Sequence, residues 1–161
     1  MHHLLRLIQE SDNAPLSRII KTSLEELGCA LEGTVYTDEG TNHLFDFYQD
    51  ERTAYYIAEW DGKVVGGSGI APIPNQTENY CELQRMFLHK AARGKGIGQS
   101  LMKKCLDFAA GARYDLVYIE TFETMTQARK LYEQSGFQYI DHQLGDTGHF
   151  SCGVKMILPL K

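Results

Sequence analysis

The sequence has no long hydrophobic segment and no recognisable export signal. None of its apolar runs approaches the roughly 20 residues that a helix needs to cross a bilayer. The first ten residues, MHHLLRLIQE, contain Arg6 and Glu10, where a secretory signal would keep a longer apolar stretch. We therefore expect a cytoplasmic protein that does not act in a membrane.

Cysteine and basic residues are also few. The four cysteines form no C-x-x-C pair, so we expect reduced thiols rather than a disulfide framework. The six histidines have no zinc-ligand spacing, and we expect no metal. Acidic residues outnumber basic ones by 21 to 16, and the net charge of -5 argues against a nucleic-acid-binding surface.

The residues that are present alternate between helical and strand-like periodicity, without a repeat or a linker. With 43% apolar residues in 161, we expect a single domain over residues 1–161. Strands and helices mix throughout, which indicates the α/β (α+β) class with one mainly antiparallel sheet. The expected strands are residues 3–9, 54–60, 63–72, 80–88, 114–122, a short one from 137 and a last one within 151–160; the expected helices cover 13–27 with Asn13 as N-cap, 41–50, 97–108 and a stretch around 128–135.

Two turn signals divide these elements. Asp61-Gly62 is a dipeptide that favours a tight hairpin turn, so residues 54–73 should form a β-hairpin. The segment RGKGIG, Arg93 to Gly98, places three glycines at every second position between a strand and a helix. Because glycine is costly in regular structure, three of them here indicate a specific backbone requirement.

That requirement is best explained by a bound anion. A helix N-terminus has unpaired N–H groups and the positive end of the helix dipole, and glycine removes the Cβ that would keep an anion away. Lys90, Arg93 and Lys95 add positive charge within an acidic chain. The segment therefore suits a phosphate or pyrophosphate, with a tight turn that binds nothing as the alternative.

The spacing of the glycines excludes two common phosphate-binding loops. A Walker loop requires G-x-x-x-x-G-K-[ST], which the chain lacks. The dinucleotide fingerprint G-x-G-x-x-G would require glycine where Gln99 stands, and it belongs to the first βα turn of its fold. The pattern that fits is R-x-x-G-x-G.

With two further segments, this loop resembles the GNAT acetyltransferase superfamily. The strand YCELQRMFL, residues 80–88, precedes the loop, and ARKLYEQSGF, residues 128–137, follows it with the pattern A-x-x-L-Y-x-x-x-G-F. The match covers residues 80–140, and the hairpin at 54–73 fits the preceding strands. The resemblance implies the GNAT fold, a twisted, mixed, mostly antiparallel sheet flanked by helices, in which two central strands splay apart.

The resemblance also implies acetyl-CoA as cosubstrate and no metal. In the family, loop amides hold the pyrophosphate, the strand before the loop pairs with the pantetheine arm, and an N–H of that strand holds the thioester oxygen. Many members have Asn where this chain has Met125, so Thr126 or a backbone group must substitute. The implied cofactor-binding residues are Met86, Phe87, Leu88, Arg93, Gly94, Lys95, Gly96, Ile97, Gly98, Gln99, Ser100, Met125, Thr126 and Ala128.

Acetyl transfer needs a base for the amine and an acid for the departing thiolate. The tyrosine of the family's L-Y pair is Tyr132, and a phenol beside the sulfur can donate a proton; the alternative is a core residue. Glu82 lies 11 positions before Arg93, the spacing of the general-base glutamate in the histone-acetylating branch; the alternative is a partner for an arginine or a substrate-orienting group. By alternation, Glu82, Gln84 and Met86 should share one face of their strand, and Cys81, Leu83, Arg85 and Phe87 the other.

The acceptor site is the least defined part. Residues 1–50 and the segment 144–153 would build it in this fold, with Arg85, Tyr55, Tyr56, His149 and Cys152 as candidate lining residues. We expect a small amine or amino acid as acceptor. A protein lysine or N-terminal acetyltransferase and a non-catalytic acyl-CoA-binding module are the alternatives. Members of the family are often dimers, so a homodimer is one assembly to test.

Overall fold

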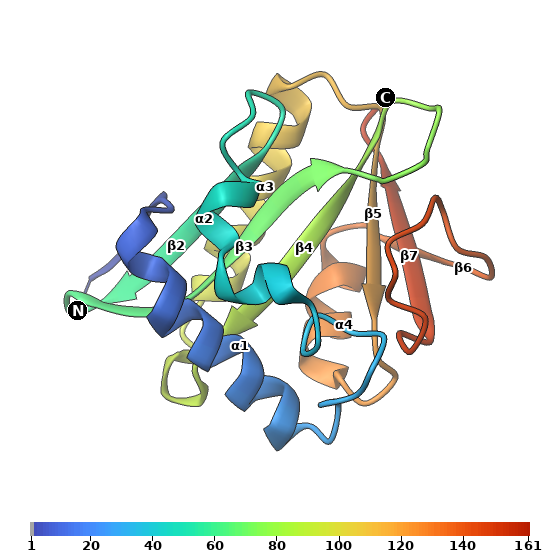
Figure 1. Ribbon diagram of the computed structural model, residues 1–161. Helices are drawn as coiled ribbons and strands as arrows, with labels where there is room; N and C mark the ends of the chain where they lie inside the picture. The colour runs from blue at the N-terminus through green and yellow to red at the C-terminus, as the bar shows by residue number, and fades with distance from the viewer. Residues whose placement is uncertain (1) are drawn as a thin grey trace.

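The computed structural model of the chain describes residues 2–161 and contains one seven-stranded sheet, with strand order β1-β2-β3-β4-β5-β7-β6 (Figure 1). All neighbouring strands are antiparallel except β4 and β5. The strands are β1 (His3–Leu7), β2 (Ala54–Trp60), β3 (Lys63–Pro72), β4 (Tyr80–Leu88), β5 (Leu116–Thr121), β6 (Gln138–Ile140) and β7 (Val154–Pro159); the α-helices are α1 (Asn13–Glu26), α2 (Leu44–Phe47), α3 (Ile97–Gly111) and α4 (Thr126–Gln134).

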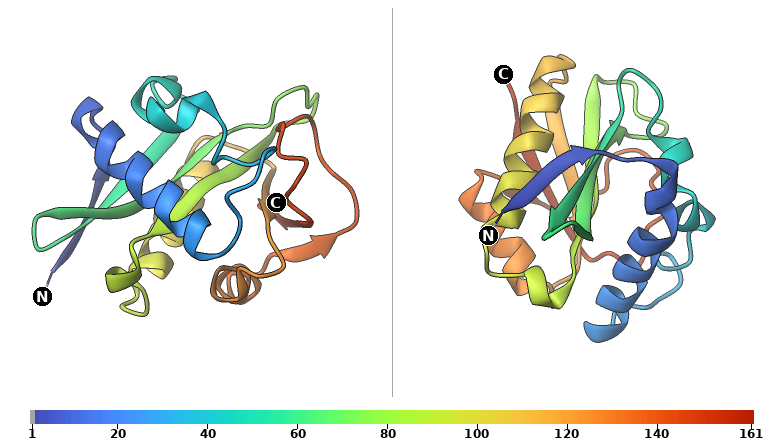
Figure 2. Two further views of the ribbon diagram at one scale, coloured as in Figure 1. Left: turned by 60° about the horizontal axis from the view of Figure 1, so that its bottom comes forward. Right: turned by 90° about the vertical axis from the view of Figure 1, so that its left-hand side faces the viewer.

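Helices cover both faces of the sheet (Figure 2). The helices α1 and α2 pack on one face through a cluster that includes Leu16, Ile20 and Leu44. On the opposite face, α3 and α4 pack through a cluster that includes Met102 and Tyr132. The expected mixed, mostly antiparallel sheet between helices is confirmed.

Local signals explain the hairpin but not the start of α1. Asp61 and Gly62 both have positive φ, 48° and 75°, as a tight hairpin turn requires, so this prediction is confirmed. The predicted N-cap of α1 is wrong by one position, because Asp12 is the N-cap and Asn13 is the first helical residue. Asn13 Oδ1 instead accepts a hydrogen bond of 2.9 Å from the amide of Phe45, which ties α1 to α2.

The strand β4 contains a bulge at Arg85, a non-glycine residue with φ 49°. Gly67 pairs with Phe87 and Gly69 with Gln84, so Arg85 and Met86 together oppose a single residue of β3. The Tyr55 hydroxyl donates a hydrogen bond of 2.8 Å to the Arg85 carbonyl oxygen, which holds this irregular backbone in place.

The bulge overturns the predicted alternation along β4 beyond Gln84. Met86 packs with Leu83 on the α3 face rather than beside Glu82. Arg85 and Phe87 lie instead on the α1 face, where Phe87 joins the α1 cluster. Simple period-two alternation fails here because the extra residue shifts every later side chain to the other face.

The strands β4 and β5 separate after a short paired segment. Their parallel pairing covers only Tyr80–Glu82 of β4 and Leu116–Tyr118 of β5. Beyond that point β5 continues to pair with β7 as far as Thr121. The expected splay is confirmed, and it leaves the β5-facing edge of β4 without a strand partner among residues 83–88 of this structure.

Within residues 2–161, no helix is both long enough and apolar enough to cross a membrane. The four cysteines are free and buried, as expected for reduced thiols. The cellular compartment and the single-domain organisation stay predictions.

A methyl group at Gly67 should destabilise the protein. A Cβ there would lie 2.5 Å from the carbonyl oxygen of Tyr56 and closer still to the Tyr55 ring. Since backbone cannot move aside cheaply, we expect Gly67→Ala to lower the free energy of unfolding by about 1–3 kcal/mol in urea titrations. Gly111→Ala, where a Cβ meets nothing within 4 Å, is the matched control and should be neutral or stabilising. Equal stability of the two variants would contradict the prediction.

Candidate active site

A groove runs between the free edge of β4, the start of α3 and the helix α4. Most of the predicted cofactor-binding residues line it, from β4 (Met86, Phe87, Leu88), the glycine loop (Arg93, Gly94, Gly96, Gly98, Gln99) and α4 with its preceding residue (Met125, Thr126, Ala128). The groove also includes Lys130 of α4 and Ser23 of α1. Three segments far apart in the sequence therefore meet at one surface.

Three predicted residues point away from this groove. The Ile97 side chain is fully buried in a core cluster, and Lys95 Nζ lies 5.3 Å from the centroid of the Trp60 ring. Ser100 Oγ donates a hydrogen bond of 3.2 Å to the carbonyl oxygen of Gly96. Any contact of Lys95 or Ile97 with a ligand in the groove must therefore come from their main-chain amides.

The glycine loop presents free N–H groups. Among residues 2–161, the backbone amides from Gly94 to Gln99 have no hydrogen-bond acceptor, and the first bonded amide is Ser100, which donates to Gly96. Gly94 and Gly96 have φ of 74° and 80°, and a Cβ at either would enter open space. A row of unpaired donors at the N-terminus of a 15-residue helix fits an anion such as a pyrophosphate.

Arg93 holds the end of β4 against α1. Its Nε donates a hydrogen bond of 2.9 Å to the Leu88 carbonyl oxygen, and Nη2 lies 3.2 Å from Ser23 Oγ and 3.3 Å from Glu26 Oε2. The side chain lines the groove, and its Nε and Nη2 donors are engaged within the protein. Arg93 thus fixes the position of the glycine loop relative to the strand.

A smaller, more buried cavity lies beside the groove where β4 and β5 separate. The groove and the cavity share Met86, Phe87 and Met125, so they adjoin at these residues. Glu82 and Tyr132 both line the cavity, and so do the three predicted acceptor-site residues Arg85, His149 and Cys152.

The two other residues predicted for the acceptor site do not line this cavity. Tyr55 is fully buried in the α1 cluster, with its hydroxyl bonded to the β4 bulge. Tyr56 points to the opposite face, where its ring packs against Phe108 at a centroid distance of 6.5 Å. Adjacent strand residues face opposite sides of a sheet, so these two could not have shared a pocket.

Glu82 is a buried carboxyl group whose pKa lies near neutrality. Only 4% of its surface is exposed, and burial, with a contribution from the charge of Glu120, raises its pKa to about 7. A hydrogen bond of 2.7 Å from Gln84 Nε2 to Oε1 and the nearby charges of His149 and Arg85 oppose the increase. Its other oxygen, Oε2, has no hydrogen-bond partner among the described residues.

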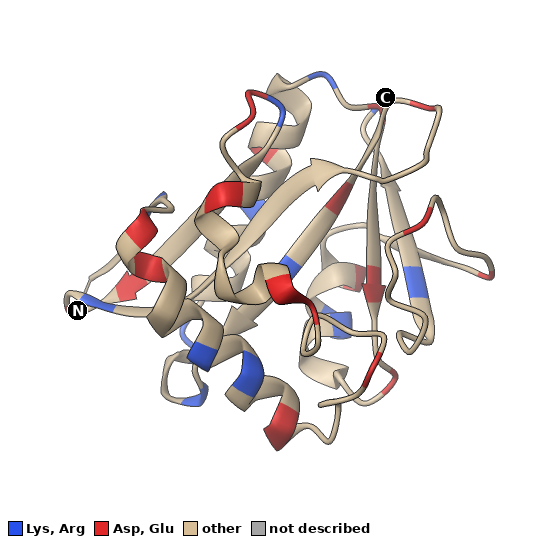
Figure 3. Ribbon diagram, in the orientation of Figure 1, with Lys and Arg blue, Asp and Glu red and all other residues tan. Residues whose placement is uncertain are grey.

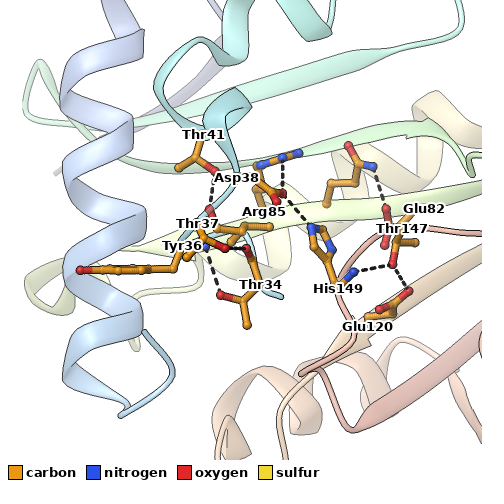
Figure 4. A network of polar contacts seen from close by, with 12 residues as sticks. Thr34, Tyr36, Thr37, Asp38, Thr41, Glu82, Arg85, Glu120, Thr147 and His149 are labelled. Carbon is orange, nitrogen blue, oxygen red and sulfur yellow. Dashed lines mark hydrogen bonds and ion pairs between the residues drawn. The ribbon is translucent and has the colours of Figure 1, made fainter. Parts of the chain in front are cut away.

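A chain of polar contacts connects Glu82 with two loops (Figure 4). Gln84, which binds Glu82, accepts a hydrogen bond of 2.6 Å from the Tyr48 hydroxyl. Arg85 donates to the same hydroxyl at 3.3 Å and to Asp38 Oδ2 at 3.1 Å. Asp38 Oδ2 also lies 2.7 Å from His149 Nε2. The cavity therefore joins β4 to the loop before α2 and to the segment 144–153.

Sequence reasoning missed Asp38, Tyr48 and Glu120. Glu120 lies on β5 two residues beyond Tyr118, the register partner of Glu82, so strand alternation alone could have placed both carboxylates on one face. Its Oε1 accepts a hydrogen bond of 2.7 Å from Thr147, whereas Oε2 is buried without a partner. Asp38 lies in a loop with no periodic signal, and nothing in the sequence indicates its place.

Tyr132 packs in the core and also reaches the cavity. Its ring lies 6.0 Å from that of Phe137, and burial raises its pKa above the ordinary value of 10. The hydroxyl has no hydrogen-bond partner among residues 2–161. Tyr132 is thus a core residue that also belongs to the cavity lining, and its role as an acid stays a prediction.

The described residues contain no group of three or more His, Cys, Asp or Glu side chains that could hold a metal ion.

Comparison with known proteins places this chain beside acetyltransferases. The family model for the acetyltransferase (GNAT) family matches residues 21–137. The N-acetyltransferase YjgM of Escherichia coli K12, itself uncharacterized, is 35% identical over 158 residues, 98% of this chain and 95% of that protein. Human N-acetylaspartate synthetase is 32% identical over 120 residues, 74% of this chain but 37% of that protein.

Solved structures share the fold at lower sequence identity. A GNAT-family acetyltransferase from Staphylococcus aureus Mu50 superposes with a TM-score of 0.80 at 18% identity, over 99% of this chain and 100% of that one. The structure of yncA from Salmonella typhimurium, determined with its cofactor acetyl-CoA, has a TM-score of 0.77 at 18% identity, over 100% of this chain and 95% of that one.

Proposed function

The chain belongs to the acetyltransferase (GNAT) family, and from this membership we propose that it transfers the acetyl group of acetyl-CoA to the primary amine of a small molecule or amino acid. Acetyl-CoA-dependent N-acetyl transfer is the activity of the family. The observation that supports the finer proposal is that two sites adjoin: the groove lined by free amides shares Met86 and Phe87 with a small cavity that is lined by Glu82 and Tyr132.

The groove has the features that acetyl-CoA requires. The amides from Gly94 to Gln99 would hold the pyrophosphate, and the free edge of β4 over Met86–Leu88 would pair with the pantetheine arm. Met125 offers no side-chain amide, so Thr126, which lines the groove, is the substitute donor. Lys130 is the basic groove residue that can reach a terminal phosphate. When bound, acetyl-CoA supplies an activated thioester and a thiol leaving group.

Glu82 is proposed as the base. An ammonium group that enters the cavity must lose a proton before it can attack a carbonyl carbon, and a carboxylate with a pKa of about 7 is half ionised at neutral pH. Tyr132 is proposed as the acid, because its raised pKa keeps the phenol protonated and its hydroxyl is unpaired. Both residues line one cavity, as the two proton transfers require.

The enclosure of the cavity favours a small acceptor over a protein substrate. The segment 144–153 crosses to the loop before α2, where the Ser151 side chain donates a hydrogen bond of 2.6 Å to the Glu32 carbonyl oxygen. Together with the contact between His149 and Asp38, this bond ties the segment that contains His149 and Cys152, two residues of the cavity lining, to that loop. A long peptide would have to open these contacts, whereas an amino acid would not. The name of the human relative, N-acetylaspartate synthetase, is consistent with an amino acid acceptor.

An assay of thiol release tests the proposal. The purified chain with acetyl-CoA is offered simple amines, free amino acids and peptides with lysine or an N-terminal amine. Turnover with small acceptors only is the expected result. Turnover with peptides only would favour the protein acetyltransferase, and acetyl-CoA binding without turnover would favour the non-catalytic module.

The variant Tyr132→Phe tests the acid role. Since the hydroxyl has no partner within the protein and the ring keeps its packing, we expect kcat to fall roughly 10- to 100-fold while the Kd for acetyl-CoA stays within about 2-fold. Steady-state kinetics and calorimetry measure the two quantities. Tyr139→Phe, an exposed tyrosine on β6 outside both sites, is the control. An unchanged kcat in Tyr132→Phe would assign this tyrosine to packing alone.

A further inference from the structure

The bulge in β4 brings a charged side chain into the cavity that regular alternation would direct to the other face. Arg85 has φ 49°, a conformation that costs a non-glycine residue energy. Without the extra residue, its side chain would point to the α3 core. With it, Arg85 lines the same cavity as Glu82, and the Tyr55 hydroxyl holds its carbonyl oxygen.

The guanidinium of Arg85 is nearly buried but only partly satisfied. Its side chain is 11% exposed, yet a guanidinium has five N–H donors and Arg85 makes two side-chain hydrogen bonds, to Tyr48 and Asp38. The Nε atom is buried and has no partner. Each of these partners accepts a single hydrogen bond from Arg85. A planar guanidinium can instead donate two parallel hydrogen bonds to one carboxylate.

Asp38 balances the charge of only one of its two cationic neighbours. The same oxygen, Oδ2, contacts Arg85 at 3.1 Å and His149 at 2.7 Å. Burial alone would lower the pKa of His149, but the hydrogen bond to Asp38 and its negative charge raise it overall. One carboxylate thus serves two cationic groups, and the cluster has an excess of positive charge whenever His149 is protonated.

Two acidic residues line the same cavity as Arg85 and His149. Glu82 on β4 and Glu120 on β5 line it, each with one carboxylate oxygen, Oε2, that has no hydrogen-bond partner among the described residues. In Figure 3 the middle of β4 has both an acidic and a basic segment, and β5 has an acidic one beside them. The cavity lining therefore combines cationic and acidic side chains with apolar ones such as Ile119 and Phe122.

From this arrangement we infer that the acceptor is a free α-amino acid, whose carboxylate binds to Arg85 and His149 while its amino group lies at Glu82 and Glu120. A zwitterion has an anion for the cationic side chains and a cation for the acidic ones. A simple amine, an amino acid amide or a peptide N-terminus lacks the anion for Arg85. The inference rests on the proposed function. In the reaction, the ammonium of the acceptor first gives one proton to Glu82, and the neutral amine forms the N–C bond of the amide as the C–S bond of the thioester breaks. The departing thiolate takes the Tyr132 proton and leaves as CoA thiol, and the second proton lost by the nitrogen restores the phenol, so that one proton remains on Glu82.

Matched acceptors test the inference. Thiol release by the purified chain is measured with acetyl-CoA and the standard L-amino acids, and then with the α-carboxamide and the decarboxylated amine of the best acceptor. The free acid should exceed both analogues in kcat/KM by about 100-fold or more, because the analogues lack the carboxylate that would satisfy the remaining buried donors of Arg85. Comparable kcat/KM for acid and carboxamide would overturn the inference and leave the proposed function intact. No turnover with any amine, despite acetyl-CoA binding, would overturn both.

The variant Arg85→Met tests whether Arg85 causes the preference for the free acid over its analogues. It should reduce the preference for the acid over the carboxamide to less than about 5-fold, because kcat/KM falls much further for the acid than for an analogue that never used the charge. Lys103→Met, which removes an exposed charge on α3, should keep the full preference. If Arg85→Met fails to fold, His149→Gln should still weaken the preference at pH 6 more than at pH 8. A retained 100-fold preference in folded Arg85→Met would overturn the assignment.

Discussion

Replacing Glu82 with glutamine should lower kcat/KM by roughly 10²- to 10⁴-fold, the usual contribution of a positioned general base. Glutamine keeps the size of the side chain and can still contact Gln84, which now binds the Glu82 carboxylate at 2.7 Å. The loss would therefore come from proton acceptance and not from a cavity. Binding of acetyl-CoA, measured by calorimetry, should stay within about 2-fold, because Glu82 does not line the cofactor groove.

The pH dependence of kcat/KM distinguishes a Glu82 that acts as general base from one that only orients the substrate. Burial raises the pKa of Glu82 to about 7, so the wild-type kcat/KM should rise with pH through a limb near 7, where the protonated carboxyl becomes a base. In Glu82→Gln this limb should disappear, and only the ionisation of the amine substrate should remain. A variant that is slow but keeps the limb near 7 would mean that Glu82 orients the acceptor without acting as base.

The same substitution should stabilise the fold at alkaline pH. The pKa of Glu82 is higher in the folded chain than the ordinary 4.5, so the folded state binds more protons between these values and its stability falls as pH rises toward 7. Glutamine cannot ionise, so the variant avoids the free-energy cost of a buried carboxylate. Its free energy of unfolding at pH 8 should exceed that of wild type by about 1–3 kcal/mol. At pH 4 the two proteins should differ little.

Glu120→Gln is the matched control, since it makes the same change on the neighbouring strand within one cavity. The negative charge of Glu120 contributes to the raised pKa of Glu82. Its removal should keep the pH limb but shift the midpoint below 7. If Glu120→Gln instead abolished the limb and Glu82→Gln kept it, the base would be Glu120.

The parts of this protein that the sequence predicted are those that depend on neighbours along the chain. The turn at Asp61-Gly62 follows from two residues that tolerate positive φ, and the free amides of the glycine loop follow from helix geometry just after a strand. The periodic helices follow in the same way. Each of these features needs only a few consecutive residues.

The features that the sequence did not predict depend on pairing between distant segments. The bulge at Arg85 is set by the register between β3 and β4, which no local pattern reveals, and it moved Met86 away from the face of Glu82. The contact between Asp38 and His149 joins residues 111 positions apart. The cofactor groove was therefore largely predictable, whereas the acceptor cavity became visible only with the strands in register.

Replacing Gly96 with valine should weaken acetyl-CoA binding by about 100-fold, equivalent to ~2.7 kcal/mol. Gly96 has φ 80°, which a β-branched residue adopts only with strain, and a Cβ there would enter the groove in front of the free amides. Calorimetric titration with acetyl-CoA measures the Kd. Gly62→Val is the control, because Gly62 has a similar φ of 75° and open surroundings but lies in the β2–β3 turn, outside the groove.

A truncated cosubstrate identifies which part of the ligand the loop contacts. S-acetylpantetheine lacks the diphosphate, so the amides from Gly94 to Gln99 have nothing to bind, and wild type and Gly96→Val should use it with the same kcat/KM. Gly96→Val should thus be defective with acetyl-CoA alone. An equal loss with both substrates would mean that the substitution distorts β4 or the cavity instead. Undiminished affinity of Gly96→Val for acetyl-CoA would place the diphosphate elsewhere and remove the basis for assigning the groove to this ligand.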